Sequence, residues 1–172
     1  MEVYNPKHKN FLIKNLYEAD WTPLFPGIKG RTGASGPPFT QENIGNMGID
    51  LISLEEGASF PMHTHPGSHI LFILHGEGYV VIEETTYETS EGDCFFIPGN
   101  IPHAVGAKQA QQLLAIGFPH KSLIDPKRMD ITDNNYLTDN PMIAKMYSGE
   151  NTEERTKFLS DFQNRNNLDI LE

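Results

Sequence analysis

Short apolar runs separated by turn residues dominate the middle of the chain. The runs are rich in Ile, Leu, Val and Phe, are bounded by Gly, Pro, Asn or acidic clusters, and span residues 45–54, 69–74, 79–83, 94–97 and 113–116. Helical periodicity is absent across this stretch. Because several short strands follow one another closely, the pattern predicts an all-β protein, an antiparallel sandwich or barrel rather than a βαβ unit.

The pattern changes on both sides of this stretch and predicts three regions. Residues 1–40 form an N-terminal segment packed on the barrel, irregular around the aromatic-rich stretch that begins at Trp21. Residues 41–120 form the barrel itself. Residues 121–172 form a C-terminal extension that is partly helical.

Two helices are expected in the C-terminal extension. One spans residues 141–147, with a proline in its first turn, and the other runs from a capping box at Asn151 and Glu154 to about residue 165. The second helix carries a narrow apolar stripe, formed by Phe158, Leu159 and Phe162. Such a stripe docks on the parent domain or, as the alternative, forms a subunit contact.

Charge and cysteine content exclude several classes of partner. Thirteen Lys and Arg against 23 Asp and Glu give a net charge of −10, which disfavours nucleic acid and anionic membrane surfaces. The longest apolar run, residues 70–74, is too short to span a bilayer. The single cysteine, Cys94, cannot form an internal disulfide and is expected to be a small buried hydrophobe. Together with the polar first ten residues, this predicts a reducing, cytoplasmic setting.

Positive charge is missing from the predicted barrel. Between Thr32 and Ala107 there are ten acidic residues, five of the seven histidines and no Lys or Arg. An anionic ligand bound there must find its positive charge elsewhere. Arg31 is the nearest upstream cation, and it is either an exposed loop arginine or a partner for a carboxylate at the mouth of the barrel.

Four histidines have the spacing of a metal site. His63 and His65 share one face of an extended segment, and His69 follows across a Pro-Gly turn. A later strand and turn lead to His103. Imidazole is a ligand for Zn, Fe, Ni, Cu and Mn, so the set predicts one bound divalent ion, with Fe, Ni, Zn and Mn as the candidates. The alternatives are solvated or core histidines, or a cluster that has lost its metal.

These residues resemble the two motifs of the cupin superfamily. The first, G-x5-H-x-H-x3-E-x6-G, is matched by Gly57, His63, His65 and Gly76, with His69 in place of the glutamate. The second, G-x5-P-x-G-x2-H-x3-N, is matched by Gly92, Pro98 and His103, with Asn100 and Ala107 as departures. Asn100 is a mild change, because asparagine tolerates the left-handed conformation of a turn glycine. The resemblance implies an antiparallel jelly-roll β-barrel with His63, His65, His69 and His103 as metal ligands.

The histidine at position 69 changes the chemistry that the resemblance implies. Four neutral imidazoles leave a divalent ion with about +2 net charge, whereas three imidazoles and a carboxylate leave about +1. The site also loses a carboxylate that could move protons. All-histidine iron cupins, including dioxygenases, resemble this arrangement more closely than the glutamate-bearing members do.

The remaining candidate residues are expected at the surface, in turns or in the pocket wall, and not as metal ligands. His75 lies too far along its strand to share the ion with His69, and His120 is expected on the surface. Strand parity with the ligands predicts an apolar pocket lined by Leu71, Ile73 and Val105. The acidic pairs at residues 55–56 and 83–84 adjoin turn signals and are expected to be solvated.

The sequence therefore predicts a metal-dependent cupin enzyme that acts on a small organic substrate, with a dioxygenase-type oxidoreductase favoured. The alternatives are a non-catalytic metal- or ligand-binding module and a Lewis-acid isomerase or decarboxylase. No catalytic residue is assigned, because no separate base or nucleophile stands out. Barrel edges and the C-terminal apolar stripe predict a homodimer.

Overall fold

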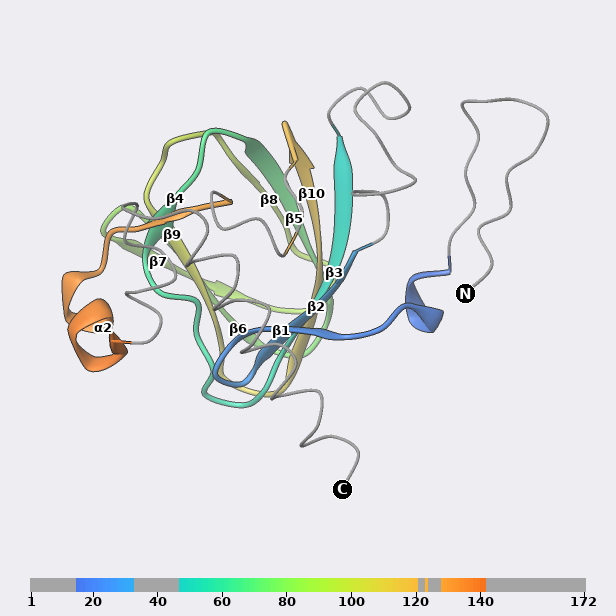
Figure 1. Ribbon diagram of the computed structural model, residues 1–172. Coiled ribbons are helices and arrows are strands. Elements are labelled where there is room, and N and C mark those ends of the chain that lie inside the picture. Colours follow the sequence, from blue (N-terminus) through green and yellow to red (C-terminus); the bar gives the residue numbers. More distant parts are fainter. Residues whose placement is uncertain (1–14, 33–46, 121–122, 124–127, 142–172) are drawn as a thin grey trace.

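The computed structural model describes residues 15–32, 47–120, 123 and 128–141. Two antiparallel sheets curve around a common interior and form a jelly-roll barrel (Figure 1). The predicted all-β fold class is confirmed.

The larger sheet has six strands, in the spatial order β1-β2-β3-β10-β5-β8. Their bounds are β1 Thr22–Phe25, β2 Ile28–Thr32, β3 Gly48–Leu54, β5 Ser68–His75, β8 Cys94–Ile97 and β10 Gln111–Phe118. β10 pairs with β3 on one side and with β5 on the other along nearly its whole length. This sheet therefore supplies the longest continuous wall of the barrel.

The smaller sheet has five strands, in the order β11-β4-β9-β6-β7. Their bounds are β4 His63–Thr64, β6 Gly78–Ile82, β7 Thr85–Thr89, β9 His103–Ala107 and β11 Asp130–Ile131. A short 3-10 helix, η1 Leu16–Glu18, precedes the strands, and the helix α2 Asn134–Asp139 follows them. The Asp133 side chain caps α2 by accepting a hydrogen bond from the backbone N–H of Tyr136.

The apolar core lies between the two sheets. Alternate residues of a strand face the interior, as in β3, where Asp50, Ile52 and Leu54 are buried on one side. Residues from both sheets complete the core: Leu71, Ile73, Val80, Ile97, Val105, Ala107 and Leu113. Asp50 is the exception in this apolar row, since it is a carboxylate with no exposed surface.

The five predicted strands correspond to β3, β5, β6, β8 and β10, with ends that differ by a few residues. The expectation of an irregular segment around Trp21 is wrong, because β1 and β2 form a hairpin that extends the six-stranded sheet at β3. Gly27 closes this hairpin with a φ of 70°, which glycine adopts without strain. The apolar pattern did not predict β7, because most of its residues are polar and exposed.

Cys94 corrects a second expectation. It begins β8 and is exposed rather than buried. Its partner across β5 is Phe72, which is also exposed, so both residues lie on the outer face of the sheet. Strand parity places Phe95 and Ile97 inward and leaves Cys94 and Phe96 outward.

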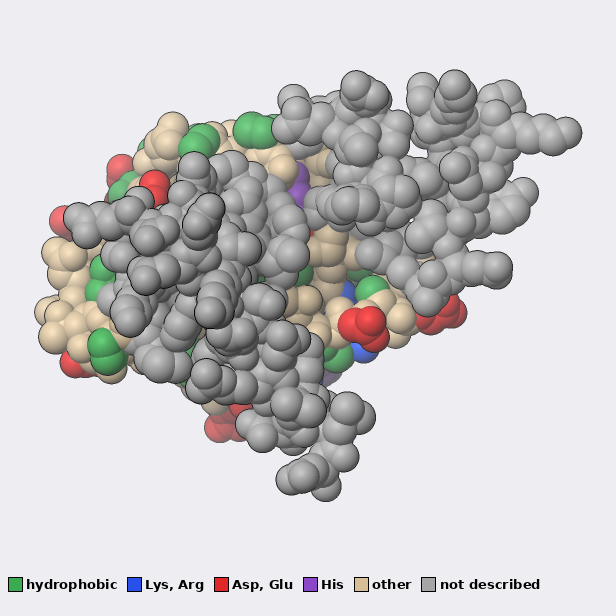
Figure 2. Space-filling model, viewed as in Figure 1, with side chains coloured by type: hydrophobic (Ala, Val, Ile, Leu, Met, Phe, Trp, Pro, Cys, Tyr) green, Lys and Arg blue, Asp and Glu red, His purple; other side chains and the backbone are tan. Residues whose placement is uncertain are grey.

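Acidic side chains are spread around the edge of the face shown in Figure 2, where few Lys or Arg side chains are visible among the described residues. No helix among the described residues is long and apolar enough to cross a bilayer. The helix predicted over residues 151–165, with its stripe of Phe158, Leu159 and Phe162, lies outside the described residues, and so does the helix predicted over residues 141–147 except for its first residue.

Candidate metal centre

The four predicted histidines come from both sheets and meet in the barrel interior. His63 begins β4, His65 follows that strand directly, and His103 begins β9 as the Cα partner of His63. His69 is the second residue of β5, in the opposite sheet. The Pro-Gly turn after His65 carries the chain from one sheet to the other, which is how residues close in sequence face each other across the interior.

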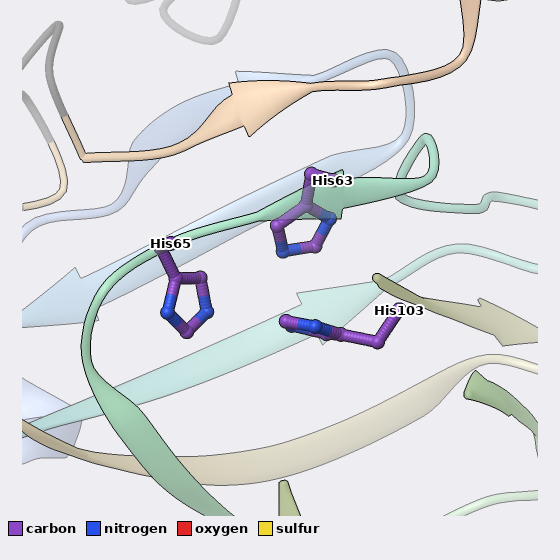
Figure 3. Close-up of side chains that lie close together, drawn as sticks. All are labelled: His63, His65 and His103. Carbon is purple, nitrogen blue, oxygen red and sulfur yellow. The ribbon is translucent and has the colours of Figure 1, made fainter. Parts of the chain in front are cut away.

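The imidazole rings converge on one small volume. One ring nitrogen from each of His63, His65 and His103 lies within 4.8 Å of the other two, and their rings point toward a shared space in Figure 3. His69 joins the group, with ring centroids 4.7 Å from both His65 and His103. The centroids of His63 and His103 are 4.3 Å apart. The structure thus brings the four imidazole rings together, and the set whose ligand nitrogens lie within 4.8 Å of one another is His63, His65 and His103. Ligation by His69 stays a prediction.

Backbone carbonyls fix the tautomer of three of these rings. The Nδ1 atoms of His63, His65 and His103 lie 2.7–2.8 Å from the carbonyl oxygens of Pro61, Gly67 and Ile101. A carbonyl only accepts, so each Nδ1 donates and each Nε2 carries the lone pair. Orienting a ligand imidazole through its other nitrogen is the usual arrangement in metal sites.

Two of the Nε2 atoms are buried without a hydrogen-bond partner among the described residues, those of His69 and His103. Leaving buried polar atoms unpaired costs about 1–3 kcal/mol each. An ion bound by these nitrogens would remove that cost. The donor set therefore fits a divalent metal that accepts imidazole ligands.

Burial keeps the histidines neutral. Desolvation lowers the pKa of His65 to about 4 and that of His69 to about 2, with the neighbouring His103 adding to both shifts. Desolvation also lowers the pKa of His63 and His103. Because metals bind the deprotonated imidazole, the cluster is ready for a metal at neutral pH without losing a proton.

A cavity of about 50 Å³ adjoins the four histidines. Apolar side chains form most of its wall: Ile52, Phe60, Val105, Leu113, Ala115 and Met129. The prediction that Val105 lines the pocket is confirmed. Leu71 and Ile73 do not line it, because they pack deeper in the core, where they are 2% and 0% exposed.

One further residue lines the cavity, and sequence analysis missed it. Arg128 lines the cavity from the segment before β11, and its Nη2 donates to Asp50 Oδ2 over 3.0 Å. The charge of Arg128 also contributes to the lowered pKa values of His63, His65 and His69. The detectable signal was Asp50, since a carboxylate in the inward row of an apolar strand requires a buried partner.

His120 belongs to the same network, which corrects the expectation of a surface residue. Its side chain is 5% exposed, and its Nε2 lies 2.8 Å from Asp50 Oδ2. The ring rests against the backbone of Gly48, where a Cβ would collide with it, and against that of Gly117, where a Cβ would be in tight contact at 3.0 Å. Burial alone would raise the pKa of Asp50, but the charge of Arg128 and the hydrogen bond from His120 lower it instead.

Arg31 does not line the cavity. Its guanidinium stacks over the Trp21 ring at 4.0 Å, and its Nη1 donates to the carbonyl oxygen of Tyr17 over 2.8 Å. These contacts hold η1 and the start of β1 against β2. The two interpretations left open for Arg31 were an exposed loop arginine and a partner for a carboxylate. Neither matches these contacts, which are structural.

The other sequence assignments fit the structure. His75 is exposed at the end of β5, 3.5 Å from the Glu91 carboxylate and away from the cavity. Asn100 has a φ of 64°, the left-handed conformation expected where the second motif carries glycine. Glu83 and Glu84 form the exposed turn between β6 and β7.

Comparison with known proteins identifies a matching family model and solved structures with a similar fold. Residues 50–116 match the family model of the cupin domain. The chain matches no curated protein. Among solved structures, an RmlC-like cupin from Shewanella frigidimarina is 16% identical, with a TM-score of 0.57, over 71% of this chain and 97% of that one.

Two other structures share the fold. KdgF from a Halomonas species is 22% identical, with a TM-score of 0.53, over 62% of this chain and 91% of that one. Salicylate 1,2-dioxygenase from Pseudoaminobacter salicylatoxidans is 19% identical, with a TM-score of 0.51. That match covers 56% of this chain but only 28% of the dioxygenase. At these identities the similarity extends to the barrel and not to the reaction.

Proposed function

Because the chain is a member of the cupin superfamily, we propose that it is a metal-dependent enzyme acting on a small organic substrate, with a dioxygenase-type oxidation as the favoured reaction. The ligands are His63, His65, His69 and His103. The observation that carries the proposal is the convergence of four imidazoles, buried at His63 and His103 and half-buried at the other two positions, around one cavity. Two of these imidazoles hold an unpaired Nε2. A divalent ion there supplies Lewis acidity or, if it is iron, redox chemistry with dioxygen.

The chain's own residues contribute position and environment. The carbonyls of Pro61, Gly67 and Ile101 hold three imidazoles in the ligating tautomer. The apolar wall excludes water, which strengthens electrostatic contacts inside the cavity. Salicylate 1,2-dioxygenase, part of which shares this fold, supports the proposal as a precedent, since one of its structures is a complex with gentisate.

Elemental analysis of untagged protein is the first test, since a histidine tag itself collects metal. The second is oxygen consumption by the iron-loaded protein with a panel of small hydroxy acids. Iron with substrate-dependent oxygen uptake supports the proposal. A panel that leaves oxygen uptake at its background rate contradicts the oxidation.

A non-catalytic binding module is the second candidate, and a separate observation favours it. Among the described residues that line the cavity there is no carboxylate to serve as a base. A closed four-coordinate zinc site would support the binding module. An isomerase or decarboxylase activity would instead support the third candidate, a Lewis-acid enzyme. X-ray absorption of the loaded protein distinguishes four-coordinate zinc from six-coordinate iron.

We also propose that the protein forms a homodimer. β8 is an edge of the six-stranded sheet, and Phe96, at 59% exposure, stacks on Phe118 on its outer face. Exposed aromatic residues on an edge strand are typical of an interface between copies. Light scattering at micromolar concentration should give twice the chain mass, and Phe96→Asp should reduce it to the monomer mass. A monomeric parent protein would refute this proposal.

A further inference from the structure

The metal cavity has one permanently charged side chain among the described residues of its wall, that of Arg128. The other lining residues are the four histidines of the metal centre and apolar side chains. A guanidinium in such a position attracts a negatively charged group in the cavity, and its planar fork matches the two oxygens of a carboxylate.

Arg128 is held in place by residues that have no other contact with the cavity. Its Nη2 donates to Asp50 Oδ2, and the same oxygen lies 2.8 Å from His120 Nε2. Asp50 is fully buried and the Arg128 side chain is 18% exposed. Since the guanidinium is already fixed, a ligand that binds to it does not incur the entropic cost of ordering a long side chain.

The local charge contrasts with that of the whole protein. The chain carries a net charge of −10, yet Arg128 lines the cavity while the Asp50 carboxylate that pairs with it does not, and a divalent ion held by four neutral imidazoles would keep about +2. The cavity is then a positive site inside an acidic protein. Anions are repelled from the surface in general and are attracted here.

We propose that the cavity binds a small organic carboxylate, with the carboxylate group against the Arg128 guanidinium and the remaining atoms beside the histidine cluster. This inference rests on the proposed function, because the ligand shares the cavity with the metal. A volume of about 50 Å³ holds roughly four water-sized groups. The part of the ligand that enters the cavity is therefore only a few non-hydrogen atoms in size, and Arg128 is a specificity-determining residue.

Glycolate and glycolamide form a matched pair of probes, because they have the same number of non-hydrogen atoms and differ in charge. Calorimetric titration of the metal-loaded parent protein should show glycolate binding at least about tenfold more tightly than glycolamide. Arg128→Gln should remove most of that preference, and Arg128→Lys should retain part of it, since lysine keeps the charge but loses the fork. Lys108→Gln is the control, because Lys108 is an exposed cation paired with Glu88 outside the cavity.

Three results would overturn the inference: no preference for glycolate in the parent protein, an unchanged preference in Arg128→Gln, or an equal loss in Lys108→Gln. An unchanged preference in Arg128→Gln would mean that the metal alone binds the carboxylate. If Arg128→Gln does not fold, the double variant Asp50→Asn/Arg128→Gln removes both buried charges and gives the same reading. Titration after removal of the metal with a chelator separates the carboxylate proposal from the metal proposal. A preference for glycolate that depends on Arg128 persists without metal, so it would be measured even if the parent protein never carried a metal ion.

Discussion

Two side-chain clusters that contain histidine lie in the same barrel and differ in their partners. The four imidazoles of the metal centre have no carboxylate partner among the described residues that line the cavity, and two of them leave Nε2 unpaired. His120 also leaves one nitrogen, Nδ1, unpaired, but its Nε2 lies against the buried Asp50, which also accepts from Arg128. Burial alone therefore does not make a histidine a ligand, because a carboxylate already uses the Nε2 of His120 and none uses those of the metal centre.

The two groups also have opposite electrostatic character. Desolvation is the largest cause of the lowered pKa values in the metal centre and keeps its imidazoles neutral. The ring nitrogens therefore keep lone pairs that can bind a metal. In the Asp50 cluster the opposite charge of Arg128 overcomes desolvation and keeps the carboxylate ionised. The first cluster directs ring nitrogens of several histidines toward one space, whereas the charges of the second cluster pair with each other and position Arg128.

The largest effect is expected from removing a ligand of the metal centre. His103→Ala should weaken metal binding by a few hundredfold, about 3–4 kcal/mol, because a four-ligand site worth about 10–16 kcal/mol loses one donor. His63→Ala and His65→Ala should behave alike. Competition with a chromophoric chelator measures the affinity, and His75→Ala, a change at an exposed histidine, is the control. Full metal occupancy in His65→Ala would disprove the assignment.

Breaking the Asp50 cluster should instead reduce stability. Asp50→Asn keeps the shape of the side chain but leaves Arg128 without its buried counter-charge, at a cost of about 3 kcal/mol in the free energy of unfolding. Urea denaturation measures this cost. The control is Glu88→Gln, which breaks an exposed ion pair with Lys108 and should cost less than about 1 kcal/mol. Equal effects of the two substitutions would show that the buried cluster carries no special weight.

Acid should separate the two groups in the metal-free protein. The folded-state pKa of His65 is about 4, against 6.5 for an ordinary histidine, and His63, His69 and His103 shift in the same direction. Between these values the unfolded chain binds protons that the folded protein does not, so the free energy of unfolding falls as pH falls from 6.5 toward 4. The Asp50 contribution is present throughout this window, since its pKa is lowered from 3.8.

Urea denaturation of chelator-treated protein at pH 7.5 and pH 5 tests this dependence. The variant His65→Gln should show a shallower decrease, because one proton-binding difference is removed. Equal stability of the parent protein at the two pH values would contradict the burial argument.

The smallest effect is expected from changing the type of one ligand. His69→Glu replaces an imidazole by a carboxylate and lowers the net charge of the site by one unit. It should still bind one metal per chain and favour Mn over Ni by roughly tenfold relative to the parent protein, because carboxylate oxygen is the harder donor. Competition binding with the two metals measures the ratio. Identical selectivity would mean that His69 does not ligate the ion and that His63, His65 and His103 form a three-histidine site.

Local sequence signals were sufficient for five of the strands and for the histidine cluster, but not for the hairpin of β1 and β2 or for the polar strand β7. The five apolar runs of the sequence correspond to β3, β5, β6, β8 and β10, because period-two burial is a property of short segments and their turns. The spacing of His63, His65 and His69 across a Pro-Gly turn, and the glycine-like conformation of Asn100, are likewise local.

The contacts of the charged residues were decided only by the tertiary structure. His120 and Arg128 lie 70 and 78 residues from Asp50, and no local pattern says that they meet at one carboxylate oxygen. Arg31, the nearest cation along the chain, stacks on Trp21 instead. The sequence by itself determined the barrel and its four imidazoles, because these follow from spacing. Which cation lines the cavity depended on the contact between Arg128 and Asp50, because a buried charge takes its place from a partner distant in the chain.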